Sequence, residues 1–241
     1  MNRLLGCAAS LYLLSATVVT AADLPVPAAS PEWSWDRHVQ AYDWTGPYVG
    51  VNGGGTWGVS SQTQTLPPTA SSSGNFDLRG GLVGGTAGFN IQLGQTVFGI
   101  DGDIDWINSK GTTACRAGAF VCSTATDYLA TGRALVGYAF QNNFLGYITG
   151  GAAFGNINQS FSPTLSGNSG TISNRIGWTV GTGVQYAFWT PWSSNWSIKF
   201  EYLYIDLGTF NCTVACSGIN GQITSTKLQE NVFRTGINYR F

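Results

Sequence analysis

Three aspartates alternate with other residues at Asp101, Asp103 and Asp105, a spacing that could gather oxygen ligands for a cation. An EF-hand calcium loop needs glycine at its sixth position and a bidentate glutamate at its twelfth. Those positions hold Trp106 and Thr112, so this form of calcium site is rejected. Alternate residues of a β-strand share one face, and the triplet is better interpreted as the polar side of a strand.

Cysteine is the second residue type that could do chemistry. Cys115 and Cys122 are close in sequence, as are Cys212 and Cys216. In an exported protein two local disulfides are the expected outcome among three possible connectivities. Zinc binding is the alternative, but the surrounding segments contain no histidine and the spacings are not Cys-x-x-Cys.

Histidine chemistry is limited to one residue, His38, which precedes the first predicted strand. Acyl transfer on a lipid commonly uses a serine activated by histidine, and no histidine follows His38. Haem ligation is similarly restricted. Met1, the one methionine, lies in an N-terminal segment that is predicted to be cleaved, so tyrosine would be the remaining axial ligand. We therefore expect no enzyme activity, cofactor or metal.

The chain begins with an export signal. Arg3 precedes an apolar stretch over 4–19, and Thr20-Ala21-Ala22 forms a small-residue cleavage site, so 1–22 is predicted to be a signal peptide. A membrane anchor is disfavoured, because no basic flank follows the apolar stretch. Residues 23–43, with three prolines, are predicted to be an irregular periplasmic lead-in.

Composition narrows the class of protein. The 241 residues include 33 Gly, 9 Trp, 10 Tyr and 13 Phe, and only 10% are charged, against roughly 25% in average soluble domains. A formal net charge of −1 argues against a nucleic-acid partner, and the aromatic content argues against disorder. After the signal, no apolar stretch is long enough for a spanning helix.

Residues 44–241 show a two-residue periodicity typical of strands. Short connections near 94–96, 141–143 and 189–195 alternate with long polar ones near 58–77, 108–125, 156–173 and 208–227. Transmembrane barrels sort their connections in this way. The sequence therefore predicts an all-β, eight-stranded antiparallel up-and-down transmembrane barrel, with short periplasmic turns, long extracellular loops and strands near 44–57, 78–93, 97–107, 126–140, 144–155, 174–188, 196–207 and 228–241.

The alternation also predicts which side chains enter the lumen. In the last strand Phe233, Ile237, Tyr239 and Phe241 share the apolar face and Arg234 lies on the other. Both faces of the strand near 144–154 are mixed, and its register stays open. The charges predicted to face inward could form a salt-bridged plug or, helped by inward glycines, a polar path for small solutes. They are Asp101, Asp103, Asp105, Arg133, Lys199, Glu201 and Arg234.

Several short motifs resemble the small outer-membrane barrels of alphaproteobacteria, the porin-like 25/31-kDa outer-membrane immunogenic protein family, related in fold to the OmpA transmembrane domain and to opacity proteins. They are Trp44–Asn52, Gly88–Gln92, Phe98–Asp103, Gly132-Arg133 with Gly137-Tyr138, Tyr147–Gly151 and Tyr239–Phe241. The resemblance implies an abundant envelope protein of the Gram-negative outer membrane with structural, antigenic and host-contact roles. Some members are described as porins and some as haemin binders.

The resemblance also implies that the barrel-assembly machinery reads the C-terminal aromatic strand, through Phe233, Ile237, Tyr239 and Phe241. We expect an outer-membrane barrel with a structural and surface-interaction role, whose partners are membrane lipid, lipopolysaccharide and host or envelope molecules. The alternative is a small-solute diffusion channel. A lipid-modifying enzyme is a third and weaker hypothesis.

Overall fold

The computed structural model describes residues 42–66, 69–115, 120–140, 143–163, 168–190, 193–212 and 223–241. The predicted signal peptide, His38 and Cys216 lie outside these ranges. Among the described residues, no helix is long and apolar enough to cross a membrane.

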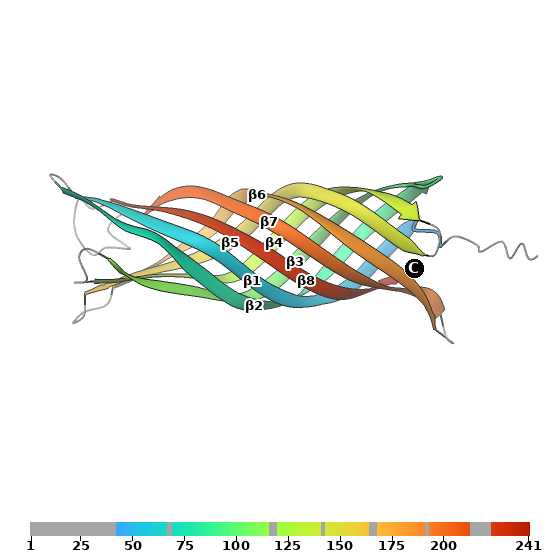
Figure 1. The fold of residues 1–241 in the computed structure, drawn as a ribbon, viewed down its shortest axis with the longest axis horizontal. Helices are drawn as coiled ribbons and strands as arrows, with labels where there is room; N and C mark the ends of the chain where they lie inside the picture. The colour runs from blue at the N-terminus through green and yellow to red at the C-terminus, as the bar shows by residue number, and fades with distance from the viewer. Residues whose placement is uncertain are drawn as a thin grey trace, which may run out of the picture. The chain divides into compact units, whose positions relative to one another are not determined.

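Eight antiparallel strands form one closed sheet in which each strand pairs with its neighbours in the chain and β1 closes onto β8 (Figure 1). This confirms the predicted eight-stranded barrel. The strands are β1 (Gly46–Leu66), β2 (Thr69–Leu93), β3 (Thr96–Cys115), β4 (Phe120–Phe140), β5 (Phe144–Pro163), β6 (Asn168–Thr190), β7 (Ser193–Cys212) and β8 (Ile223–Arg240).

Tight connections lie at one end of the barrel, here called the turn end, where β1 begins and β8 finishes. Gly94 and Gln95 join β2 to β3, and Gly94 has a φ of 65°, a left-handed conformation that glycine adopts without strain. Asn143, before β5, has a φ of 64°, which asparagine tolerates better than most residues. The C-terminus also lies at this end (Figure 1).

The far end differs from the prediction of long loops. Residues 58–66 belong to β1 and 69–77 to β2, and these two extensions pair with each other as far as Leu66 and Thr69. The other connections predicted to be long also contain strand extensions. Their Ser, Thr and Asn content suggested loops. Consecutive antiparallel strands nevertheless continue to pair, because pairing satisfies backbone N–H and C=O groups and the β-branched threonines suit a strand.

The outer surface carries an apolar band between two groups of aromatic rings. Near the turn end the rings of Phe144 and Tyr186 lie 4.7 Å apart and those of Trp196 and Tyr239 lie 5.1 Å apart. Toward the far end Trp178 and Tyr204 lie 5.5 Å apart. Such paired girdles mark the two interfaces of a membrane-spanning barrel.

The interior is more apolar than the predicted lumen of glycine, polar residues and charges. One buried cluster fills the turn end: Trp44, Val97, Leu135, Ala139, Leu145, Tyr147 and Ala187. A second lies toward the far end: Phe76, Leu78, Leu82, Ile107, Leu129, Ala153, Ile157, Leu203, Ile205, Leu207, Leu228 and Val232. In β5, whose register the sequence left open, Leu145 and Tyr147 point inward while Phe144, Ile148 and Phe154 are exposed.

Candidate functional site

The seven predicted lumen charges all lie buried on inward faces, between the two apolar clusters. β3 contributes Asp101, Asp103 and Asp105, while β4 and β8 each contribute an arginine. β7 contributes both Lys199 and Glu201. Alternation along each strand places these side chains inward, and closure of the sheet brings the four strands around one narrow space.

Arg234 contacts three carboxylates. Its Nη1 lies 2.6 Å from Asp105 Oδ2, and its Nη2 lies 2.9 Å from Asp103 Oδ2. The same Nη2 lies 2.6 Å from Glu201 Oε2, to which Nε also donates at 2.8 Å. Glu201 is on the neighbouring strand, whereas the two aspartates reach Arg234 across the lumen.

Arg133 completes the network from the other side. Its Nη2 lies 2.6 Å from Asp103 Oδ2 and 3.1 Å from Asp101 Oδ2, while Nη1 lies 3.1 Å from Glu201 Oε1. Asp103 and Glu201 therefore each bridge both arginines. Lys199 stands further off, with Nζ 3.8 Å from Glu201 Oε2. Each charge has an opposite partner, which offsets the large cost of removing it from water.

Two tyrosines that the sequence analysis missed support this network. Tyr147 donates to Glu201 Oε1 at 2.8 Å, and the Tyr48 hydroxyl lies 3.5 Å from Asp101 Oδ2. Each stands directly opposite an inward glycine on the next strand, Tyr48 opposite Gly88 and Tyr147 opposite Gly183. Pairing of an aromatic residue with glycine across two strands was the available signal.

Those glycines do not open a path for solutes. A Cβ on Gly88 would lie 2.5 Å from the Tyr48 ring, and one on Gly183 would overlap Tyr147. The expectation that inward glycines leave room in the lumen is therefore wrong at these positions. The missing side chains make space for the tyrosine rings.

Buried apolar side chains lie in the lumen on both sides of the charges. Along β4 the inward residues are Leu135 toward the turn end, then Arg133 and Thr131, then Leu129. Along β7 the charged pair at 199 and 201 is followed by Leu203 and Ile205. The charged network thus lies within a packed core.

At the turn end, residues 42–45 cover the end of the barrel. Trp44 is 1% exposed, and its backbone N–H donates to Gln92 Oε1 at 2.8 Å. The guanidinium of Arg240 lies 5.6 Å from the Trp44 ring and 5.2 Å from the Tyr48 ring, and it donates to the Gly46 carbonyl at 3.1 Å. Residues 42–45 are thereby held against the mouth of the barrel.

Replacing Arg240 with Met is expected to lower the free energy of unfolding by about 1–2 kcal/mol, because two cation–π contacts are lost. Urea unfolding of protein refolded in detergent measures this loss, and Lys227→Met, at an exposed cation of the same strand, is the control. An equal effect of both substitutions would contradict the closure.

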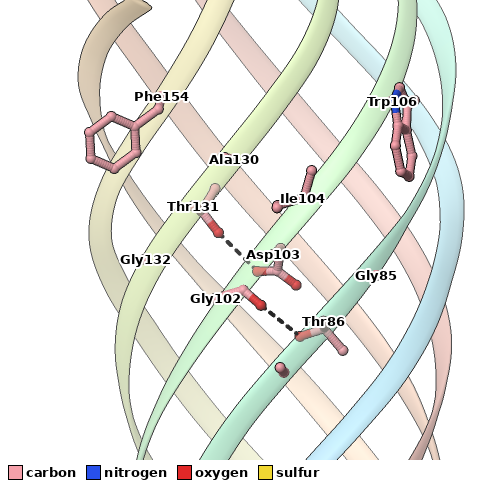
Figure 2. A pocket seen from close by; sticks show the side chains of 11 residues that line it. Gly85, Thr86, Gly102, Asp103, Ile104, Trp106, Ala130, Thr131, Gly132 and Phe154 are labelled. Carbon is pink, nitrogen blue, oxygen red and sulfur yellow. Dashed lines mark hydrogen bonds between the residues drawn. The ribbon is translucent and has the colours of Figure 1, made fainter.

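The outer surface has a groove across β2, β3 and β4, with a volume of about 660 Å³. Small residues form its floor, namely Gly85, Ala87, Gly102, Ala130 and Gly132. Trp106 and Phe154 stand at its two sides with Ile104 between them, while Thr131 donates to Asp103 behind the floor (Figure 2).

Two predicted groups of residues have roles that stay predictions. Phe233, Ile237 and Phe241 are exposed on the outer face, and the Tyr239 ring packs against Phe241, as the alternation indicated.

The backbones of Cys115 and Cys122 lie two positions apart in register on β3 and β4, since Thr113 is opposite Cys122. The cysteine side chains lie outside the described part, so both disulfides remain predictions. Within the described part no group of three or more side chains could hold a metal ion.

An eight-stranded barrel with a lipid-compatible exterior and a packed interior defines a class of membrane protein, and residues 11–241 match the family described as outer membrane protein beta-barrel domain. The chain belongs to this family and is an outer-membrane protein. It is 31% identical to the 31 kDa outer-membrane immunogenic protein of Brucella melitensis over 97% of this chain and 98% of the relative.

Two further comparisons agree. The 25 kDa outer-membrane immunogenic protein of the same organism is 29% identical, over 100% of this chain and 99% of the relative. The crystal structure of the outer membrane protein OprG from Pseudomonas aeruginosa covers 84% of this chain and 98% of its own, with a TM-score of 0.51 and 13% identity, and shares the fold. The two Brucella relatives are named as immunogenic proteins and not as enzymes.

Proposed function

We propose that this chain is a closed structural barrel that presents its far end for contact with host or envelope molecules, without enzymatic activity. The observation that carries the proposal is the filled lumen: two arginines bridged by Asp103 and Glu201 lie between two apolar clusters. A solute would have to separate these ion pairs and displace packed leucines. Both steps oppose conduction.

The contact surface in this proposal is the extended far end. β1 continues beyond Trp57 to Leu66, and β2 begins at Thr69 and pairs with this extension. Paired strands therefore extend beyond the apolar band. The relatives' designation as immunogenic supports surface exposure of such a region. Assembly would depend on the C-terminal aromatic strand as a signal to the barrel-assembly machinery.

A diffusion channel is the second candidate, and one observation favours it. Asn238 lies inward, and its buried side-chain amide has no hydrogen-bond partner among the described residues. Buried polar groups without protein partners are commonly satisfied by water. Water beside the charged network would be the start of a polar path.

Single-channel recording of the refolded protein in a planar bilayer separates the two functions. We expect no reproducible conductance steps from the parent chain, with heat-modifiable migration on a gel confirming that the barrel is folded. Reproducible steps that change in the Asp103→Asn or Arg133→Gln variant would establish the channel and overturn the closed barrel.

The contact role is tested separately by removing a far-end hairpin. Replacing residues 62–73 with a two-residue Asn-Gly turn is expected to abolish binding to host-cell surface extracts while heat modifiability persists. Binding that survives removal of each far-end hairpin in turn would contradict the surface-interaction role.

A further inference from the structure

Two exposed cations face each other on the outer surface near the far-end aromatic residues. Arg79 on β2 and Lys110 on β3 are direct partners in the antiparallel ladder, and both side chains are exposed. Trp57 on β1 is the partner of Arg79 on the other side, so the pair lies at the level of an aromatic residue that packs against Tyr202. Like charges directly opposite one another repel and destabilise a sheet.

The exposed carboxylates near this pair are Asp77 and Asp127. Neither Arg79 nor Lys110 forms an ion pair within the described residues, although each of the seven predicted lumen charges does. Asp77, two residues from Arg79 on the same face, is an exposed carboxylate that is not bonded to it. Asp127 on β4 accepts a hydrogen bond from the Asn158 side chain. The cations therefore carry positive charge that an external anion could neutralise.

Grooves lead from the cations into the lipid-facing band. A smaller one, of about 470 Å³ and of mixed polar and apolar lining, includes the outward residues Gly81, Val83, Trp106 and Asn108, which follow Arg79 and Lys110 toward the turn end, and also reaches the inward residues Gly54, Leu82 and Ile107. The larger groove of Figure 2 follows on the other side of Trp106, over Gly85, Ala87, Gly102 and Gly132. Trp106 lines both, so the two grooves adjoin along β2 and β3.

The barrel itself does not require this floor to be bare. A Cβ on Gly132 would have no atom within 4 Å, and one on Gly102 would approach nothing closer than 3.6 Å. Elsewhere the same surface carries large apolar side chains such as Ile100, Ile148 and Ile176, each at least 65% exposed. The depression is a local feature of the surface that neither packing nor backbone conformation explains.

We propose that this surface binds one lipid with a phosphorylated, anionic headgroup, the headgroup between Arg79 and Lys110 and an acyl chain along the grooves beside Trp106. The two exposed cations match an anionic headgroup, and the apolar lining of the larger groove matches an acyl chain. Arginine and lysine both bind phosphate oxygens well, arginine in bidentate form. The assignment goes beyond the closed-barrel function and depends only on the outer-membrane location.

The test measures quenching of Trp106 by lipids with brominated acyl chains. Protein is reconstituted in phosphatidylcholine bilayers containing equal small amounts of brominated phosphatidylglycerol or brominated phosphatidylcholine, and the Trp106 signal is the difference from the Trp106→Phe variant. We expect roughly a fivefold preference for the anionic lipid, the effect of one basic residue beside an anionic headgroup.

Matched variants separate the two halves of the site. Arg79→Gln with Lys110→Gln should reduce the preference to one, while Lys227→Gln, at an exposed cation of β8, should leave it unchanged. Gly132→Val should lower quenching by both lipids, while Gly150→Val, at an outward glycine outside the grooves, should not. Heat-modifiable migration checks folding of every variant.

Three results would overturn the assignment. Equal quenching by both lipids in the parent chain excludes a headgroup site at the cations. Full loss of the preference on adding millimolar inorganic phosphate shows an anion site without a lipid. A dimer in sedimentation experiments that Gly132→Val abolishes would assign the groove to a second copy of the chain.

Discussion

Replacing Arg234 with Met is expected to lower the free energy of unfolding by about 3–5 kcal/mol, the range found when one partner of a buried ion pair is removed. Arg234 is fully buried and contacts Asp103, Asp105 and Glu201. Methionine fills much of the same volume, so the loss would come from carboxylates left without a partner. Arg133 also contacts Asp103 and Glu201, whereas Asp105 pairs with no other cation in the described part of the chain.

Urea unfolding in detergent, followed by tryptophan fluorescence, measures the change. Arg79→Met removes an exposed arginine and should alter stability by under about 1 kcal/mol. The double variant Arg234→Met with Asp105→Asn should recover part of the loss, since one unpaired carboxylate is also removed. A single variant as stable as the parent chain would show that the network contributes nothing net.

Replacing Leu203 with Ala is expected to cost about 2–5 kcal/mol, the range for truncating a buried leucine in a packed core. Leu203 is fully buried in the far-end cluster, between the inward residues Gly181 and Val232 of the adjacent strands. An open, water-filled lumen would give a different result, because truncating an apolar side chain there would leave no cavity. The substitution thus measures whether the lumen is a core.

The matched control is Val51→Ala on the outer face, where the valine is 66% exposed. Detergent or lipid fills the space that the smaller side chain leaves, so we expect a cost below about 1 kcal/mol. The same unfolding experiment measures both variants. Similar costs for the two would contradict a packed interior.

Strand periodicity was sufficient to predict the barrel and the inward face of the seven lumen charges. Asp101, Asp103 and Asp105 alternate with Ile100, Ile104 and Trp106, and that pattern alone assigns the three carboxylates to the lumen and the apolar residues to lipid. The short connections in the sequence also predicted the positions of the turns, as at Gly94. These features are local, because a period of two is a property of one strand.

The extent of the strands and the interior layers were not predictable in this way. Serine- and threonine-rich stretches such as 58–66 suggested loops, but they pair with the neighbouring strand once the hairpin forms. Leu203 and Leu129 sit at inward positions of strands that also carry inward charges, and the alternation did not reveal that they meet in one cluster. Contact between them needs a closed sheet.

Which charged side chains form ion pairs with one another likewise depends on closure of the sheet into a barrel. Arg234 and Asp105 are separated by 129 positions, and their strands β8 and β3 are not neighbours in the sheet. The amino-acid order determined the number of strands, the face on which each side chain lies and the apolar exterior. Each of these depends on residues that are close in sequence, within one strand or across one short connection. Only the tertiary structure decided which charges pair, which glycines admit Tyr48 and Tyr147, and that the lumen is filled, because these depend on distances across a sheet closed upon itself.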